Sequence, residues 1–335
     1  MNENTLTDVN EETSASGAVW LDPVLTLALA QASLAAYYDY ENKPYKWPVN
    51  YRLIGRFTGW DDYIWSWGVE ERFGLIFQYT GSPPAPNRYI VAFRGTDSWS
   101  DGYSDAFWEF ANFQPYRNSV SPPPRVSAGF YDIYSTKGGS MTQSMQQQIF
   151  AMLPASATEV LITGHSLGAT LSQLFTLDMR VSSPNVNIKN INFASPRVGD
   201  ASWQAACSRY GATQRITRAI NYWDIAPDYP LEISGYVSVG AQFDTSFMRC
   251  NWWDYNPLSE HSLLNLQTVL TNCVYLPNQI WIGQFQDAVD TSYWMCSTAP
   301  PQSAAAKQAV IAKLKELSDV RANASSAPEE SQLSV

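Results

Sequence analysis

The sequence predicts an α/β domain built around a central, mostly parallel sheet. Short apolar runs bounded by turn residues recur along the chain, and helical patterns separate several of them. Strands that alternate with helices in this way are typical of a parallel sheet flanked by helices. The runs are FGLIFQYT, RYIVAFRG, EVLITG, IKNINFAS and RITRAINYW, and the helical patterns include residues 139–153 and 167–181.

The composition is that of a globular protein with an acidic surface. Hydrophobic residues make up 45% of the 335 residues and aromatic residues 14%, which is enough to build one large core. Charged residues make up only 16%, and the net charge is −10. Because phosphate groups would be repelled, we expect no nucleic-acid partner and no preference for anionic membrane surfaces.

The chain is predicted to hold a single domain with extended ends. We expect a disordered acidic tail over residues 1–18, the α/β domain over residues 19–300 with a core-facing helix at 24–39, a C-terminal helix at 301–320 and a disordered tail at 321–335. The first residues carry no basic region, and Asp22 and Pro23 interrupt the apolar run that follows. This pattern predicts neither a signal peptide nor a transmembrane segment, and hence a soluble protein that is cytoplasmic or exported by another route.

The four cysteines give no sign of a metal site. Cys207, Cys250, Cys273 and Cys296 are widely spaced and form no Cys-x-x-Cys pair. The sequence leaves open whether they are free thiols or form up to two disulfides. It also leaves the oligomeric state open.

The segment LITGHSLGAT, residues 161–170, carries the pattern Gly-x-Ser-x-Gly around Ser166. The bare pattern also occurs by chance in ordinary turns. In an α/β-hydrolase it forms a sharp turn between a strand and a helix, which aims the serine outward and needs glycines where backbone segments approach closely. Here EVLIT before the turn is typical of a buried strand and LGATLSQLFTLDMR after it of a helix. The context therefore favours Ser166 as a nucleophile.

A serine nucleophile needs a base, and the sequence offers only two histidines. His165 is adjacent to Ser166 and is expected to point elsewhere, which leaves His261. The acid should lie between the serine and the histidine in the chain, and Asp224 follows the strand-like run RITRAINYW. We therefore predict Asp224 as the acid. Its competitors are Asp228, which lies past Pro227 and further from the strand end, and Asp244 and Asp254, which lie in less regular sequence.

Six segments in order resemble the class 3 (fungal-type) lipase family of the α/β-hydrolase fold. They are YIVAFRGTDSW, GHSLGAT, INFASPRVGD, NYWDIAPDYP, GYVSVG and EHSLLNL. By this resemblance Ser166, Asp224 and His261 match the family's catalytic triad. The resemblance also implies an oxyanion hole made by Thr96 and the backbone N–H of Leu167. The chain departs from the family at Ser238 and near Ser127, where family members often carry a histidine.

The segment after Thr96 lies where such lipases carry a lid, here about residues 97–115. Aromatic side chains recur at helical spacing, with polar residues on the opposite face. This pattern predicts either a mobile amphipathic helix that covers the site or a surface helix packed permanently on the core. The predicted lid and substrate-binding residues are Trp99, Tyr103, Phe107 and Phe110.

The resemblance implies a hydrolase that cleaves acylglycerols or related fatty esters through an acyl-enzyme, acting on an ester lipid at a lipid–water interface. A phospholipase A or a soluble aryl or feruloyl-type esterase would use the same chemistry. A lipase-like binding protein is a further alternative, against which the complete set of Ser166, Asp224, His261 and Thr96 argues. Neither a cofactor nor a metal ion is expected.

Overall fold

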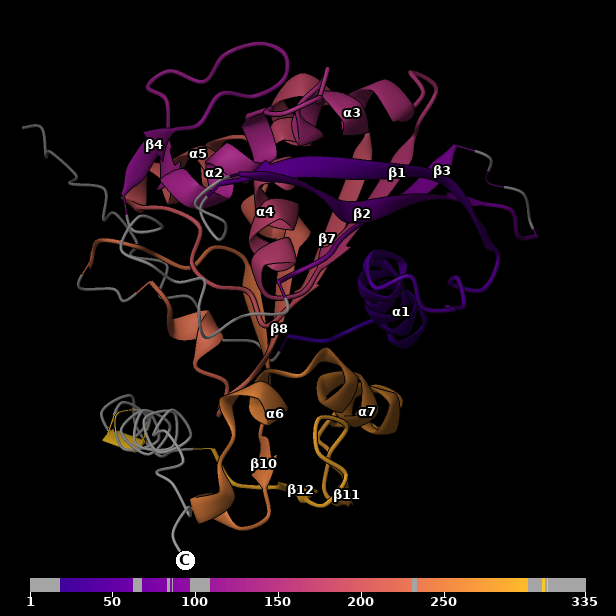
Figure 1. Ribbon diagram of the computed structural model, residues 1–335, viewed down its shortest axis with the longest axis vertical. Coiled ribbons are helices and arrows are strands. Elements are labelled where there is room, and N and C mark those ends of the chain that lie inside the picture. Colours follow the sequence, from indigo (N-terminus) through magenta and orange to yellow (C-terminus); the bar gives the residue numbers. More distant parts are fainter. Residues whose placement is uncertain are drawn as a thin grey trace, which may run out of the picture.

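The computed structural model of the protein describes residues 19–62, 68–82, 85, 87–96, 109–230, 234–300, 309, 310 and 312. Its centre is a seven-stranded sheet in the order β1-β2-β3-β6-β7-β8-β9 (Figure 1). The first three strands pair antiparallel and the strands from β3 onward pair parallel, so the predicted mostly parallel sheet is confirmed. The strands are β1 (Tyr51–Asp61), β2 (Val69–Tyr79), β3 (Arg88–Phe93), β6 (Glu159–Gly164), β7 (Asn187–Phe193), β8 (Ile216–Asn221) and β9 (Ala241–Thr245).

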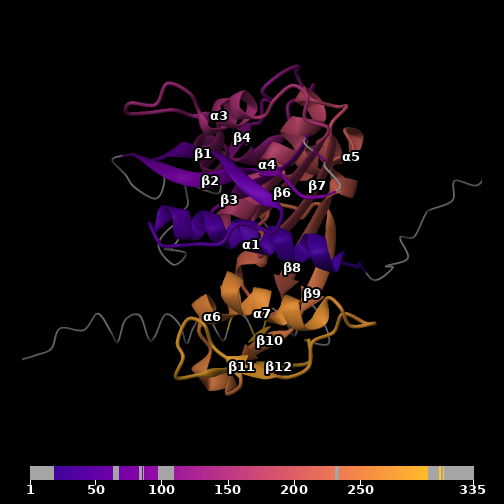
Figure 2. The same ribbon diagram turned by 90° about the vertical axis from the view of Figure 1, so that its right-hand side faces the viewer.

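Helices cover both faces of this sheet. On one face, α1 crosses β2, β3, β6 and β7 and also contacts α7 (Figure 2). On the other face, α4 packs on β3, β6 and β7, and α2 and α3 pack on β1. The helices are α1 (Pro23–Tyr40), α2 (Ala128–Ser135), α3 (Met145–Met152), α4 (Leu167–Ser182), α5 (Ala201–Arg209), α6 (Pro257–His261) and α7 (Leu263–Cys273).

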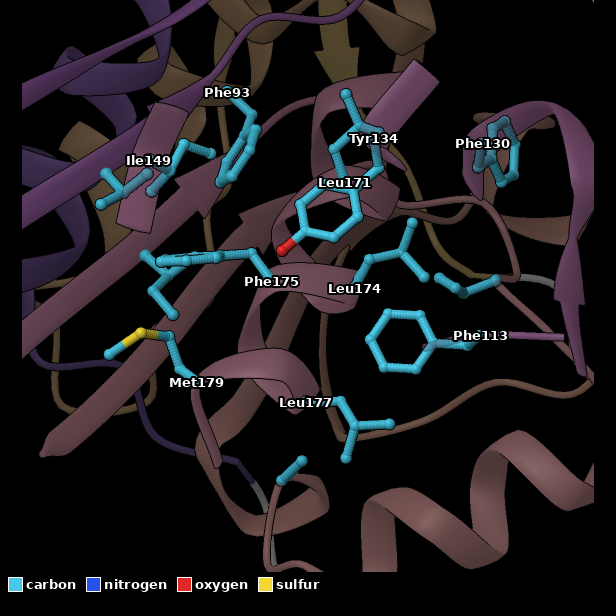
Figure 3. Packing of buried hydrophobic residues seen from close by; sticks show 14 of the residues in the cluster. Phe93, Phe113, Phe130, Tyr134, Ile149, Leu171, Leu174, Phe175, Leu177 and Met179 are labelled. Atoms are coloured by element: carbon cyan, nitrogen blue, oxygen red, sulfur yellow. The ribbon is translucent and has the colours of Figure 1, made fainter. Parts of the chain in front are cut away.

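The alternation of side chains along the strands produces two cores. In β3, Ile90 and Ala92 point to the core beneath α1, whereas Val91 and Phe93 point to the core beneath α4. Figure 3 shows the second core, in which Phe175 of α4 lies against Phe93 with ring centroids 5.9 Å apart. Nearly every residue of α4 is buried, so this helix is held firmly on the sheet.

A smaller layer follows the main sheet in the sequence. It contains α6, α7 and an antiparallel sheet of β10 (Phe247–Arg249), β12 (Trp294–Ser297) and β11 (Gln284–Gln286), in that order. A disulfide joins Cys250 to Cys296, and Cys207 and Cys273 are buried free thiols. One of the arrangements left open by the sequence is therefore realised, and it ties the two ends of this C-terminal layer together.

Shorter elements complete the described part of the chain. A two-stranded sheet pairs β4 (Phe110–Asn112) with β5 (Arg125–Ser127), and 3₁₀ turns include η2 (Thr213–Arg215), η3 (Ala226–Asp228) and η5 (Trp252–Asp254). The helix expected over residues 139–153 begins only at Met145, because Ser144 caps its first turn in a capping box with Gln147. Among the described helices, none has the length and hydrophobicity needed to cross a membrane.

Candidate active site

Ser166 lies on the turn between β6 and α4, in a backbone conformation that residues other than glycine rarely adopt. Its φ is 57° and its ψ −128°. The turn is tightly packed, since a Cβ added to Gly164 would lie 2.2 Å from the carbonyl oxygen of Gly168. A Cβ added to Gly168 would lie 2.6 Å from the carbonyl oxygen of Arg94. Both glycines of the Gly-x-Ser-x-Gly pattern are therefore required by sterics.

The serine side chain is fully buried rather than aimed into solvent. A Cβ on Gly95 would lie 3.0 Å from the Cβ of Ser166, so the segment that follows β3 packs directly against the serine. The ring of His261 approaches it from α6, with Nε2 2.8 Å from Ser166 Oγ. These neighbours explain why the serine is buried and not exposed to solvent as the sequence suggested.

His261, at the end of α6, connects Ser166 to Asp224. Its Nδ1 lies 2.8 Å from Asp224 Oδ2. When the carboxylate is ionised, Nδ1–H donates to it, and in this tautomer Nε2 accepts the hydrogen bond of the serine hydroxyl. All three side chains are buried, so the chain of hydrogen bonds is shielded from solvent. The structure thus brings together the three residues that the sequence predicts as a triad.

Asp224 follows the C-terminal end of β8 and is held by its own turn. Its Oδ1 accepts a hydrogen bond from the backbone N–H of Ala226 at 2.9 Å. Burial raises the pKa of Asp224, and the contact with His261 acts in the opposite direction. Asp228, the competitor nearest in sequence, lies instead 3.8 Å from Arg197.

His165 makes contacts that the sequence did not suggest. Its Nε2 lies 2.8 Å from the carbonyl oxygen of His261, and its Nδ1 lies 2.8 Å from the hydroxyl of Tyr37 on α1. Because a carbonyl only accepts, Nε2 carries the proton and Nδ1 accepts from Tyr37. Burial lowers the pKa of His165 well below its usual value, and the nearby His261 lowers it further. A neutral imidazole therefore links α1, the serine turn and α6.

The two residues predicted for the oxyanion hole belong to segments that adjoin Ser166. Thr96 follows Gly95, which packs against the serine. Leu167 is the first residue of α4, where backbone N–H groups have no acceptor within the helix and the helix dipole favours negative charge. Both positions are compatible with donors aimed at an oxyanion beside Ser166 Oγ, and their role stays a prediction.

Only part of the predicted lid lies among the residues that the structure describes. Trp99, Tyr103 and Phe107 lie outside the described residues. Phe110 is described, and its expected place on a helix is wrong, because it begins strand β4. Its backbone pairs with β5, and its ring stacks on Tyr236 with centroids 4.5 Å apart.

Asp287 is a buried anion that supports α6 and that no sequence pattern indicated. It accepts hydrogen bonds from both Nε and Nη2 of Arg249, at 3.1 and 3.0 Å. It also accepts from Ser259 of α6 at 2.5 Å and from Asn265 of α7 at 2.8 Å. Burial alone would raise the pKa of Asp287, but these donors outweigh it and lower the pKa. Hydrogen bonds with this charged network therefore hold α6, the helix that carries His261, in place.

Glu260, the neighbour of His261, is also buried but lacks a cationic side chain in hydrogen-bond contact. Its Oε1 accepts from the backbone N–H of Arg249 at 2.9 Å and its Oε2 from that of Asn256 at 3.3 Å. Burial raises the pKa of Glu260 to about 8. Among the described residues, no group of three or more His, Cys, Asp or Glu side chains is arranged to hold a metal ion.

Comparisons with known proteins show which families the sequence resembles. Residues 90–234 match the family described as Lipase (class 3). A lipase of Rhizopus niveus is 27% identical over 157 residues, which cover 46% of this chain and 37% of that protein. Phospholipase A1-IIalpha of Arabidopsis thaliana is 28% identical over 179 residues, which cover 47% of this chain and 42% of that protein. The chain thus spans less than half the length of these curated relatives.

The fold is shared with a solved lipase structure. A triacylglycerol lipase from Penicillium expansum superposes with a TM-score of 0.50 at 16% sequence identity, over 67% of this chain and 79% of that chain. This match shows the α/β-hydrolase fold. The match over residues 90–234 confirms the resemblance to the class 3 lipase family that is seen in the motifs. The matched segment includes Ser166 and Asp224, whereas His261 lies beyond it in the C-terminal layer.

Proposed function

We propose that the protein is a serine ester hydrolase that cleaves acylglycerols or related fatty esters. The observation that supports this proposal is the buried chain of hydrogen bonds from Ser166 through His261 to Asp224, with both links at 2.8 Å. A nucleophile, a base and an orienting carboxylate at such distances are what acyl transfer requires.

In the proposed reaction, Ser166 Oγ attacks the ester carbonyl carbon while His261 Nε2 takes the proton of the serine hydroxyl. Thr96 and the N–H of Leu167 donate to the oxyanion, and ionised Asp224 stabilises the imidazolium. His261 then returns the proton to the leaving alkoxide, which departs as the alcohol. A water molecule, deprotonated by His261, attacks the acyl-enzyme and releases the fatty acid, restoring the serine hydroxyl.

A phospholipase A reaction is the second candidate. It is supported by the similarity to phospholipase A1-IIalpha, which extends over nearly half of this chain. The chemistry at Ser166 would be the same, and only the alcohol that leaves would differ. The choice between the two substrate classes therefore depends on residues that contact the leaving group rather than on the triad.

The experiment compares wild type with Ser166→Ala on p-nitrophenyl esters from acetyl to palmitoyl, a triglyceride emulsion and phosphatidylcholine. We expect wild type to hydrolyse at least one class and the variant to lose activity by a factor of roughly a thousand or more. Circular dichroism of the variant should match wild type, since the hydroxyl is small. Retention of more than about one per cent of the activity would remove Ser166 from the mechanism.

A further inference from the structure

Three exposed tryptophans lie close together in the C-terminal layer. Trp252 and Trp253 of η5 are 57% and 56% exposed, and Trp294 at the start of β12 is 50% exposed. The rings of Trp252 and Trp253 are 5.9 Å apart and meet edge to face. The N–H of Cys250 donates to the carbonyl oxygen of Trp294 at 2.9 Å, so β12 begins beside the chain that enters η5. We call these three residues the tryptophan patch.

The tryptophan patch is attached to the segments that carry the acid and the base. Arg249 Nη1 donates to the carbonyl oxygen of Asp254, the last residue of η5, at 3.2 Å. The hydroxyl of Tyr255, the next residue, donates to the carbonyl oxygen of Trp223 at 3.1 Å. Trp223 precedes Asp224 directly. On the other side, η5 leads within a few residues into α6, which ends at His261 and exposes Leu258. A surface seated on the patch would therefore lie close to the catalytic segments.

The segment of the chain that contains the tryptophan patch carries very little charge. Residues 247–297 contain no lysine and a single arginine, Arg249, which is buried and paired with Asp287. Their acidic residues besides Asp287 are Asp254, Glu260 and Asp290, and of these Glu260 is buried. This layer thus offers no exposed cation to anionic headgroups, and the protein as a whole has a net charge of −10. A neutral or zwitterionic surface is its electrostatic match.

We propose that the tryptophan patch docks the protein on a neutral or zwitterionic lipid surface and so delivers ester lipid to Ser166. Indole rings are favoured at lipid–water interfaces, because an apolar body enters the lipid while the N–H stays among polar groups. Because these aromatic side chains are already half-exposed in water, the patch can contact a lipid surface without a preceding conformational change. The inference rests on the proposed function for the identity of the lipid as substrate.

Docking is tested separately from catalysis in the Ser166→Ala background, by sedimentation with phosphatidylcholine vesicles. The double substitution Trp252→Ala/Trp253→Ala should lower the partition coefficient about tenfold or more, because most of the exposed indole area is lost. The matched control is Trp20→Ala/Trp47→Ala, since these tryptophans are 57% and 48% exposed but lie outside the C-terminal layer. The control should bind as the parent does. Vesicles enriched in phosphatidylserine should bind the parent more weakly.

Melting temperatures establish that each variant is folded. Trp294→Ala is a second, independent substitution in the patch and should also lower binding to the vesicles. The proposal is overturned when the parent does not bind phosphatidylcholine vesicles, when the double variant binds like the parent, or when the control loses as much binding. A preference for phosphatidylserine overturns it as well. Failure of the proposed function gives a different result, in which vesicles bind normally but wild type hydrolyses no ester.

Discussion

The Nε2–H of His165 donates a hydrogen bond to the carbonyl oxygen of His261, 2.8 Å away, and the two rings lie 4.6 Å apart. The neighbour of the serine thus holds the backbone of the proposed base. A second positive charge at this distance would oppose the imidazolium that forms on His261 during the reaction. Burial prevents this, because it keeps the pKa of His165 far below its usual value.

Removing the support of His165 should slow the reaction without weakening substrate binding. In Tyr37→Phe the hydroxyl that donates to Nδ1 of His165 is lost, and we expect kcat to fall about tenfold with KM little changed. Tyr45→Phe is the matched control, since its hydroxyl binds Asp39 on the same side of the sheet. Equal kcat values for the two variants would show that the His165 contact does not position His261.

Asp224 and Asp228 should differ sharply when each is replaced by asparagine. Asp224→Asn favours the wrong tautomer of His261 and should lower kcat by a factor of roughly a thousand or more. Asp228→Asn should leave kcat within a few-fold of wild type, because Asp228 lies near Arg197. Steady-state kinetics on a short soluble ester measure both, and the reverse order would transfer the role of the acid to Asp228.

Glycine at position 164 should be indispensable for folding. Gly164→Ala would place a Cβ 2.2 Å from backbone oxygen in α4, and backbone cannot move aside without displacing the buried helix. We expect a loss of several kcal/mol of stability, or no soluble protein. Gly283→Ala is the control, because its nearest contacts are 3.4 Å away. Denaturant titration compares the two, and similar midpoints would contradict the steric explanation.

Glu260 should make stability fall as pH rises through neutrality. Its pKa is about 8 in the folded protein and near the ordinary 4.5 when unfolded, so the folded state holds a proton that the unfolded state releases between these values. The contribution of Glu260 is complete below pH 4.5 and is lost as pH rises to about 8. Glu260→Gln should flatten the decline of Tm between these limits. A Tm profile parallel to wild type would exclude this titration.

Removing one partner of the Arg249–Asp287 ion pair should destabilise the fold strongly. Replacing both partners by apolar residues should destabilise it less than the two single changes added together. Arg249→Met or Asp287→Leu alone leaves a buried charge without its partner, at a cost of about 3–5 kcal/mol. The double substitution should cost clearly less than the sum of the two. Equilibrium unfolding of the four proteins gives the coupling directly, and additive losses would mean that the two charges are not coupled through the pair.

The parts of the fold that depend on residues adjacent in the sequence could be predicted from the sequence. EVLITG coincides with β6 and the helical pattern after it with α4, because periodicity and the glycines of the turn are local signals. The histidine could be proposed by elimination, since the chain has only two. The acid Asp224 could be proposed from its place after a strand-like run, and the family resemblance then added the oxyanion-hole residues Thr96 and Leu167.

Long-range contacts could not be predicted in this way. The two hydrogen bonds of His165 reach residues 128 and 96 positions away in the sequence, and Asp287 lies 28 positions from Ser259. The error at Phe110 has the same cause, since helical spacing is a local pattern whereas β4 exists through pairing with β5. Where tertiary pairing competes with local periodicity, the pairing determines the structure.

The Cys250–Cys296 disulfide decides whether the chain stays covalently connected after a protease cuts it between the two cysteines. It joins residues 46 positions apart, and His261 lies between them together with the exposed side chains Tyr275, Ile280 and Ile282. A protease that cuts near these side chains divides the polypeptide, but the fragments remain covalently joined in oxidising surroundings. The fragment that carries Asp287 then stays attached to the fragment that carries Ser166 and His261, and the nicked protein migrates as one band without thiol and as two with it. In a reducing compartment, the same nick would leave noncovalent packing alone to keep the fragments together.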